Sequence, residues 1–146
     1  MDIQHISLLL VVILTSHLFI SNGSELNDKF LTEAQCISSA GDQEMCNAYL
    51  DLVSILPEKH LKPYYDCMNK ILPNGLGKCS ETEELYGSKE KLEELNACYK
   101  NNTDLPDGSD WTTNPDFRDF KDGVSIIGVK CLAQKRDCKK YKENEL

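Results

Sequence analysis

The sequence predicts an all-α fold of about five helices, cross-linked by disulfides and containing one long polar loop. Apolar residues recur at the three- and four-residue spacing of helices. Seven cysteines stand in a chain of 146 residues, and the N-terminus predicts the oxidising compartment in which cysteines pair. No segment alternates apolar and polar residues as a half-buried strand does. The length fits a single domain.

The N-terminus is expected to be a signal peptide over residues 1–23, which leaves residues 24–146 as the single domain. Residues 6–20 form a nearly continuous apolar run, and small residues precede position 24. The alternative is a membrane anchor, but a helix needs about 20 apolar residues to span a bilayer. This run has fifteen positions, four of them polar. We therefore expect a secreted, extracellular protein with no membrane span.

The cysteines of a secreted chain are expected to form disulfides. They are Cys36, Cys46, Cys67, Cys79, Cys98, Cys131 and Cys138. Their spacing leaves the connectivity open, and because seven is odd, one of them is unpaired or links two chains into a dimer. Zinc is the competing use of cysteine, but the sequence has no Cys-x-x-Cys pair and only one histidine after residue 23. We expect no metal and no cofactor.

Four helices are expected before residue 101. Apolar residues recur at helical spacing over residues 26–37 and 46–53. Asp42 is placed to cap the second of these helices, and Pro57 is placed to stop it.

The third helix is expected to have Pro63 in its first turn and to end at Pro73-Asn74-Gly75. Ser80 and Glu83 have the spacing of a capping box. This spacing predicts that the fourth helix opens at Ser80 and runs to Tyr99, with residues 87–88 as the place where it would break.

Residues 101–115 are rich in Asn, Thr, Asp, Gly, Ser and Pro, which predicts a long exposed loop. Asn101 begins an Asn-Asn-Thr sequon and is therefore expected to be glycosylated at the surface. Trp111 is the only tryptophan, and tryptophan is enriched at binding hot spots. Trp111 is thus a candidate partner-binding residue, with a role as a loop anchor or core residue as the alternative. The aspartates of residues 104–110 lack the order of a calcium loop.

The last helix is expected over residues 124–141, after a short helix around residues 117–120. From residue 123 to the C-terminus, six basic residues stand against three acidic ones. Cations are favourable near a helix C-terminus; the alternative is a docking surface for an acidic partner, with Lys139 and Lys140 as candidate partner-binding residues. The formal charge of the whole chain is -8, which argues against a nucleic-acid binder.

Catalytic motifs are not apparent in the sequence. A hydrolase triad needs a histidine as its base, and His60, the only histidine after residue 23, is expected in an exposed turn. No His-Glu-x-x-His, Gly-x-Ser-x-Gly or glycine-rich phosphate loop occurs. We therefore expect the protein not to be an enzyme.

One stretch of the sequence has a recognisable cysteine spacing. Cys46 follows Cys36 by ten positions, and Leu-Asn-Ala-Cys ends a helix at Cys98. In this stretch the chain resembles the microplusin-type helical antimicrobial proteins of arthropods, and the resemblance implies a secreted, cross-linked helical fold. The histidines and close cysteine pairs of those proteins are missing, so no metal residue is carried over. Odorant-binding proteins are also small, acidic and helical, but their pair of cysteines separated by three residues is absent here.

These features predict a secreted effector, of the kind found in venom or saliva, that binds an extracellular protein target. The alternative is a carrier in which the inner helix faces line a cavity for a small apolar ligand; periodicity does not separate a cavity from a solid core. An antimicrobial protein is a third hypothesis. The excess of acidic over basic residues disfavours this hypothesis, because membrane-active helices usually present a basic polar face opposite their apolar face.

Overall fold

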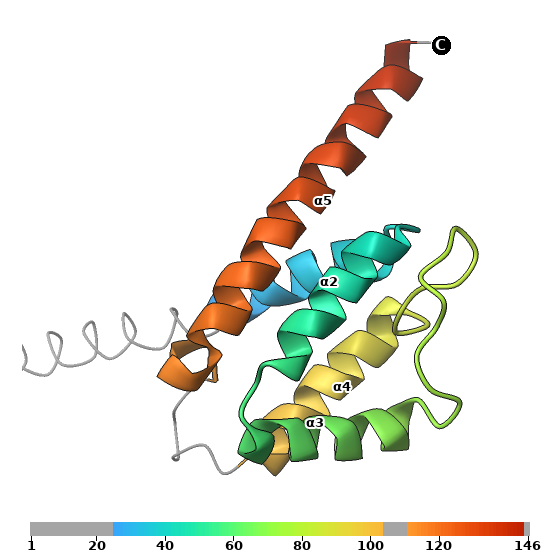
Figure 1. Ribbon diagram of the computed structural model, residues 1–146. Coiled ribbons are helices and arrows are strands. Elements are labelled where there is room, and N and C mark those ends of the chain that lie inside the picture. The colour runs from blue at the N-terminus through green and yellow to red at the C-terminus, as the bar shows by residue number, and fades with distance from the viewer. Residues whose placement is uncertain (1–24, 104–110, 145–146) are drawn as a thin grey trace, which may run out of the picture.

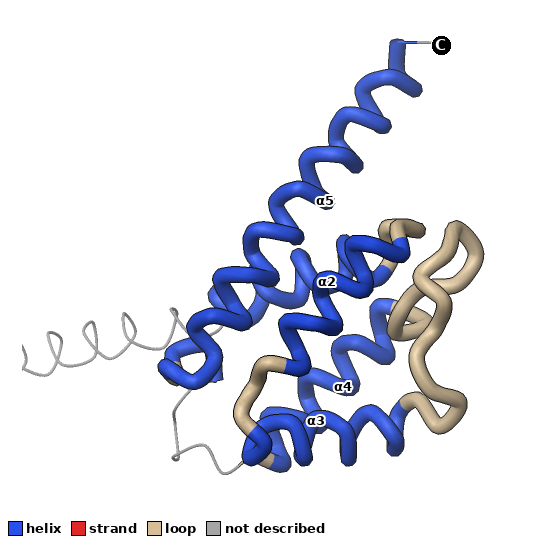
Figure 2. Tube along the Cα trace, in the orientation of Figure 1, coloured by secondary structure: helices blue, strands red, loops and turns tan. Residues whose placement is uncertain are grey.

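A computed structural model of the chain describes residues 25–103 and 111–144, with side chains up to residue 135. This part of the chain confirms the all-α prediction: it contains five α-helices and two short 3-10 helices, and no strand (Figure 2). In chain order they are residues 25–38, α2 (Gln43–Ser54), α3 (Glu58–Ile71), α4 (Lys89–Asn102), η1 (Trp111–Thr113), η2 (Pro115–Phe117) and α5 (Arg118–Asn144). The predicted signal peptide and residues 104–110 of the predicted loop lie outside the described residues.

Local capping explains where α2 begins. The carboxylate of Asp42 accepts a hydrogen bond from the backbone amide of Met45 at 3.0 Å, which satisfies one of the amides left free at a helix N-terminus. The predicted cap is therefore confirmed. α2 also ends before Pro57, as predicted, and Pro57 is then the residue that precedes α3. Because α3 already begins at Glu58, Pro63 lies inside that helix and not in its first turn.

The predicted capping box at Ser80 is wrong. Ser80 and Glu83 instead pair with each other across a tight turn, in which the amide of Ser80 donates to the carbonyl of Glu83 at 2.8 Å. The helix begins only at Lys89, where the hydroxyl of Ser88 accepts from the backbone amide of Lys91.

Tertiary contacts keep the segment before α4 out of a helix. Leu85 and Tyr86 are almost fully buried. Their backbone amides donate to the carbonyl and to the hydroxyl of Ser38, at 2.9 and 3.1 Å. These amides are therefore satisfied by helix 25–38 and not by a helical turn of their own.

Three disulfides cross-link the elements: Cys36–Cys131, Cys46–Cys79 and Cys67–Cys98. They join helix 25–38 to α5, α2 to the segment before α4, and α3 to α4. The predicted disulfide framework is thus confirmed for six of the seven cysteines. The side chain of the seventh, Cys138, lies outside the described residues.

Among α2 to α5, the pairs with the most extensive contact are α2 with α5 and α3 with α4. The C-terminal part of α5 extends away from the other helices (Figure 1). Two glycines allow α5 to approach its neighbours. A Cβ atom at Gly123 would lie 2.5 Å from the side chain of Leu52, and one at Gly128 would collide with Glu33 of helix 25–38. None of the helices described is long and apolar enough to cross a bilayer.

Candidate functional site

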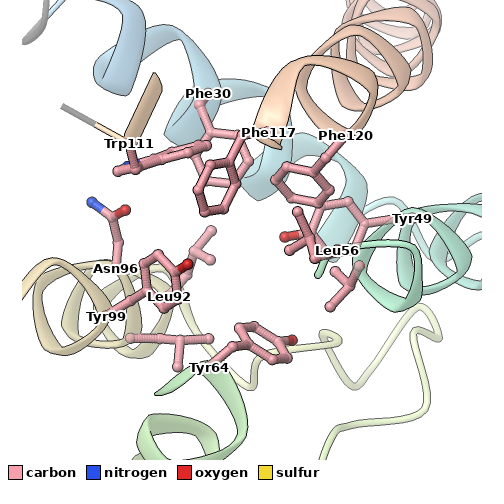
Figure 3. Close-up of a pocket in the computed structure, with 12 residues that line it drawn as sticks. Phe30, Tyr49, Leu56, Tyr64, Leu92, Asn96, Tyr99, Trp111, Phe117 and Phe120 are labelled. Carbon is pink, nitrogen blue, oxygen red and sulfur yellow. The ribbon is translucent and has the colours of Figure 1, made fainter. Parts of the chain in front are cut away.

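An aromatic cavity of about 50 Å³ lies where the elements converge. Every helix of the fold, including η1 and η2, contributes to its wall, and the side chains point toward one another around the open space (Figure 3). The lining residues are Phe30, Tyr49, Val53, Leu56, Tyr64, Leu92, Leu95, Asn96, Tyr99, Trp111, Phe117 and Phe120. A wall of this composition favours apolar contents.

Trp111 belongs to this wall and is only 3% exposed, which corrects the expectation of an exposed loop residue. Its indole ring meets Phe30 edge-on, with ring centroids 4.7 Å apart. The indole N–H donates to the amide oxygen of the buried Asn27 at 3.3 Å. Burying a large aromatic ring against other rings is more favourable in free energy than exposing it to water. The structure therefore favours the alternative role of Trp111 as a core anchor.

Tyr99 brings an unpaired polar group to the cavity. Its side chain is 8% exposed, and its buried hydroxyl has no hydrogen-bond partner among the described residues. Figure 3 shows that this hydroxyl points into the cavity. Burial raises the pKa of Tyr99 above its usual value, so the hydroxyl is neutral at physiological pH. Tyr99 was not predicted as a site residue, because in the sequence it occupies one more apolar position of the helical pattern.

Three other tyrosines, two of them also in the cavity wall, form a hydrogen-bonded chain. The hydroxyls of Tyr64 and Tyr86 lie 2.9 Å apart, and the hydroxyl of Tyr86 donates to that of Tyr49 at 3.3 Å. Burial raises the pKa of Tyr64 to about 12 and the pKa values of Tyr49 and Tyr86 well above the usual range. All three therefore act as neutral hydrogen-bonding groups.

His60 is buried in the first turn of α3, which corrects the expectation of an exposed turn. Its Nε2 atom lies 3.1 Å from the carboxylate of Asp116, and its ring centroid lies 4.3 Å from that of Phe117. Hydrogen bonds from Lys59 and then from His60 lower the pKa of Asp116. No hydroxyl or thiol of the described residues hydrogen-bonds His60, so this pair is a link between α3 and η2.

A second candidate site lies on the exposed side of α5. Ile126 is 74% and Val129 is 55% exposed, and Lys130 beside them is exposed as well. The three residues stand at i, i+3 and i+4, so they share one helix face, which we call the α5 outer face. Neither Ile126 nor Val129 was predicted as a site residue, although both fall opposite the buried Val124 and Cys131. The side chains of Lys139 and Lys140 lie outside the described residues.

Asn101 is exposed in the last turn of α4, where a glycan would meet solvent. Among the described residues, no group of three or more His, Cys, Asp and Glu side chains is arranged to hold a metal ion.

The comparisons with known proteins give one family. The family model described as "Hi1a-like: U10-hexatoxin-Hi1a" matches residues 24–131, a range that spans all three disulfides. The searches of curated proteins and of solved structures found no significant match. The match is to a hexatoxin family, which corrects the resemblance to microplusin-type proteins. The chain therefore belongs to the Hi1a-like family of cysteine-rich, toxin-like proteins.

Proposed function

We propose that this protein is a secreted, non-enzymatic effector of toxin type, and that it binds an extracellular protein target through the α5 outer face. Membership of a hexatoxin family supports an effector. The three disulfides support a role outside the cell, because such bonds persist in oxidising compartments.

The exposure of Ile126 and Val129 is the observation that carries the proposal. Both are large aliphatic side chains held in solvent on a helix whose opposite face is buried. Exposed apolar side chains that share one face next to charged residues are typical of interaction sites. A partner that covers them gains the free energy of burying that area.

Basic residues continue along α5 toward the C-terminus. Lys130 lies on the α5 outer face and is exposed, and Lys139 and Lys140 follow along the same helix. Lys135 lies on the opposite side of α5, where its ammonium group donates to the hydroxyl of Ser39 at 2.7 Å. Like charges gathered on one helix accelerate association with an acidic partner. We therefore keep Lys139 and Lys140 as partner-binding residues, whose contribution should weaken as salt is added.

The state of His60 supports binding over catalysis. Its Nε2 atom is engaged by Asp116, and its ring is packed against Phe117. A general base needs a nucleophile within hydrogen-bond reach, and His60 has none among the described residues.

The proposal is tested by binding of the fluorescently labelled, disulfide-intact chain to intact nerve and muscle cells. We expect saturable binding that mild trypsin treatment of the cells removes, as a protein target requires. A double variant, Ile126→Ser with Val129→Ser, should bind at least about 10-fold more weakly, since hot-spot residues contribute about 2 kcal/mol or more.

Ile55→Ser is the matched control. Ile55 is 58% exposed and lies at the end of α2 and not on α5, so its replacement should leave binding unchanged. Equal affinity of the double variant and the wild type would exclude the α5 outer face. Absence of trypsin-sensitive binding on every cell type would exclude the effector function.

The carrier hypothesis has one supporting observation, the aromatic cavity. Its volume of about 50 Å³ is far below the roughly 300–1,000 Å³ of sites that enclose whole ligands. A fatty acid or pheromone would need the helices to separate, and three disulfides oppose that movement. The effector function is therefore the better-supported of the two.

Intact mass spectrometry of the secreted product tests three remaining parts of the proposal. We expect a mature chain that starts at Ser24 and carries a glycan at Asn101. We also propose that Cys138 forms the intermolecular bond of a dimer, because the other six cysteines are paired. A monomer mass under non-reducing conditions would exclude the dimer.

A further inference from the structure

We propose that the aromatic cavity is a binding site for a small neutral molecule of a few heavy atoms, such as a short alcohol or ketone, whose oxygen accepts a hydrogen bond from the Tyr99 hydroxyl. This inference does not depend on the α5 outer face.

The unpaired hydroxyl of Tyr99 is the first observation behind the proposal. Buried polar groups in folded proteins are almost always hydrogen-bonded. The Tyr99 hydroxyl is buried without a partner and points into the cavity (Figure 3). The other polar groups of the wall are already paired: Asn96 donates to Asn27, and Tyr49 and Tyr64 are bonded to Tyr86. Tyr99 is thus the donor that remains for a ligand.

The composition of the wall restricts the ligand to neutral molecules. Aromatic and aliphatic side chains make up the lining apart from Asn96 and the tyrosine hydroxyls, and no charged side chain belongs to it. A charged ligand would lose its hydration without gaining a counter-ion. The ligand is therefore uncharged and mostly apolar, with one oxygen for Tyr99.

The size of the cavity restricts the ligand further. A volume of about 50 Å³ exceeds the roughly 10–15 Å³ that a cavity needs, by the same measure, to hold one water molecule, and it leaves room for only a few heavy atoms. Phe30, Tyr64 and Asn96 in the wall are only half-buried. The cavity is only partly enclosed, so a small molecule can enter it.

Trp111 supplies a direct reporter for the test, because it is the only tryptophan of the chain and lies in the cavity wall. The indole N–H resonance of the full chain is followed by NMR while 2-propanol is added. We expect a saturable shift in the wild type and saturation at an at least fivefold higher concentration in Tyr99→Phe, which keeps the ring and removes the hydroxyl. Tyr65→Phe is the matched control, since Tyr65 is 43% exposed and outside the cavity; it should behave as the wild type.

Two results would overturn the proposal. A shift that rises linearly in all variants would mean solvent perturbation around a cavity that holds at most an ordered water. Saturation at the same concentration in Tyr99→Phe and in the wild type would show that the ligand does not accept a hydrogen bond from Tyr99. Val53→Leu provides a second variant that leaves Tyr99 in place. Its larger side chain fills part of the cavity and should abolish saturation, and unchanged saturation in this variant would place the ligand elsewhere.

Discussion

Among single residues, the buried tyrosines show how burial sets chemistry in this protein. Tyr49, Tyr86 and Tyr99 are buried and Tyr64 is partly buried, and burial is the main reason why the pKa of each hydroxyl is raised. Three of these hydroxyls satisfy one another, whereas that of Tyr99 does not. The same residue type is therefore a structural group at three positions and a candidate ligand contact at the fourth.

Alkaline pH should unfold the protein through these tyrosines. A tyrosine ionises near pH 10 in the unfolded chain, and its pKa in the folded protein is higher, about 12 for Tyr64. The stability that these groups contribute is then complete below pH 10 and is lost as the pH rises through the folded-state values. We expect the free energy of unfolding, measured by urea denaturation, to be constant from about pH 7 to 9 and to fall above about pH 10.

Absorbance at 295 nm provides the check on that prediction, because it follows phenolate formation directly. Of the six tyrosines in the chain, the four whose pKa is raised should ionise late and together with loss of helical circular dichroism. Ionisation of all six near pH 10 in a chain that stays folded would contradict the assignment.

At the scale of elements, the contact between α5 and helix 25–38 depends on a residue without a side chain. Gly128 faces Glu33, which is almost fully buried and accepts a hydrogen bond from Ser125 at 3.1 Å. Glycine is unfavourable inside a helix by about 1 kcal/mol relative to alanine. Its position in α5 is therefore explained by the close approach of the two helices.

Gly128→Ala should destabilise the protein by about 1–3 kcal/mol, as overpacking of a close contact does, although alanine favours the helix. Thermal denaturation followed by circular dichroism measures the effect. Ile126→Ala is the control on the same helix, because Ile126 is exposed and its replacement should change stability by less than about 0.5 kcal/mol. A Gly128→Ala variant as stable as this control would show that the helices can shift apart.

For the whole molecule, the disulfides connect segments that lie far apart in the sequence. Cys36–Cys131 spans 95 residues and ties helix 25–38 to the long α5, whereas Cys67–Cys98 spans 31 residues and joins the neighbouring α3 and α4. A cross-link restricts the unfolded chain more when it closes a longer loop. The first bond should therefore contribute more to global stability.

Replacing both cysteines of a disulfide by serine tests which of the two bonds contributes more to stability. The chain-entropy relation gives a loss of about 5 kcal/mol for the Cys36–Cys131 bond and about 4 kcal/mol for the Cys67–Cys98 bond. Guanidinium denaturation under matched conditions measures both losses. A larger loss for Cys67→Ser with Cys98→Ser would mean that local packing, and not loop length, decides the contribution.

The sequence by itself determined those features of the fold that depend on residues close together in the chain. Helical periodicity gave the all-α class, and the short-range bond from Asp42 to the start of α2 was predictable because it joins residues three positions apart. The use of cysteine as disulfides also followed from composition and the predicted signal peptide. The capping-box spacing at Ser80 led to a wrong prediction. Ser38 of another helix satisfies the backbone amides of Leu85 and Tyr86, so this segment forms no helix.

Only the tertiary structure decided the cysteine pairing, the burial of Trp111 and the orphan hydroxyl of Tyr99. Each of these depends on which distant segments meet: Trp111 packs on Phe30 across 81 positions of the chain, and the spacing of cysteines carries no such information. Polar residues around Trp111 resembled an exposed loop, yet burying its large ring against other aromatic side chains releases more free energy than exposure does. Contacts between remote segments thus place the aromatic cavity, whereas the α5 outer face follows from helical spacing within one element.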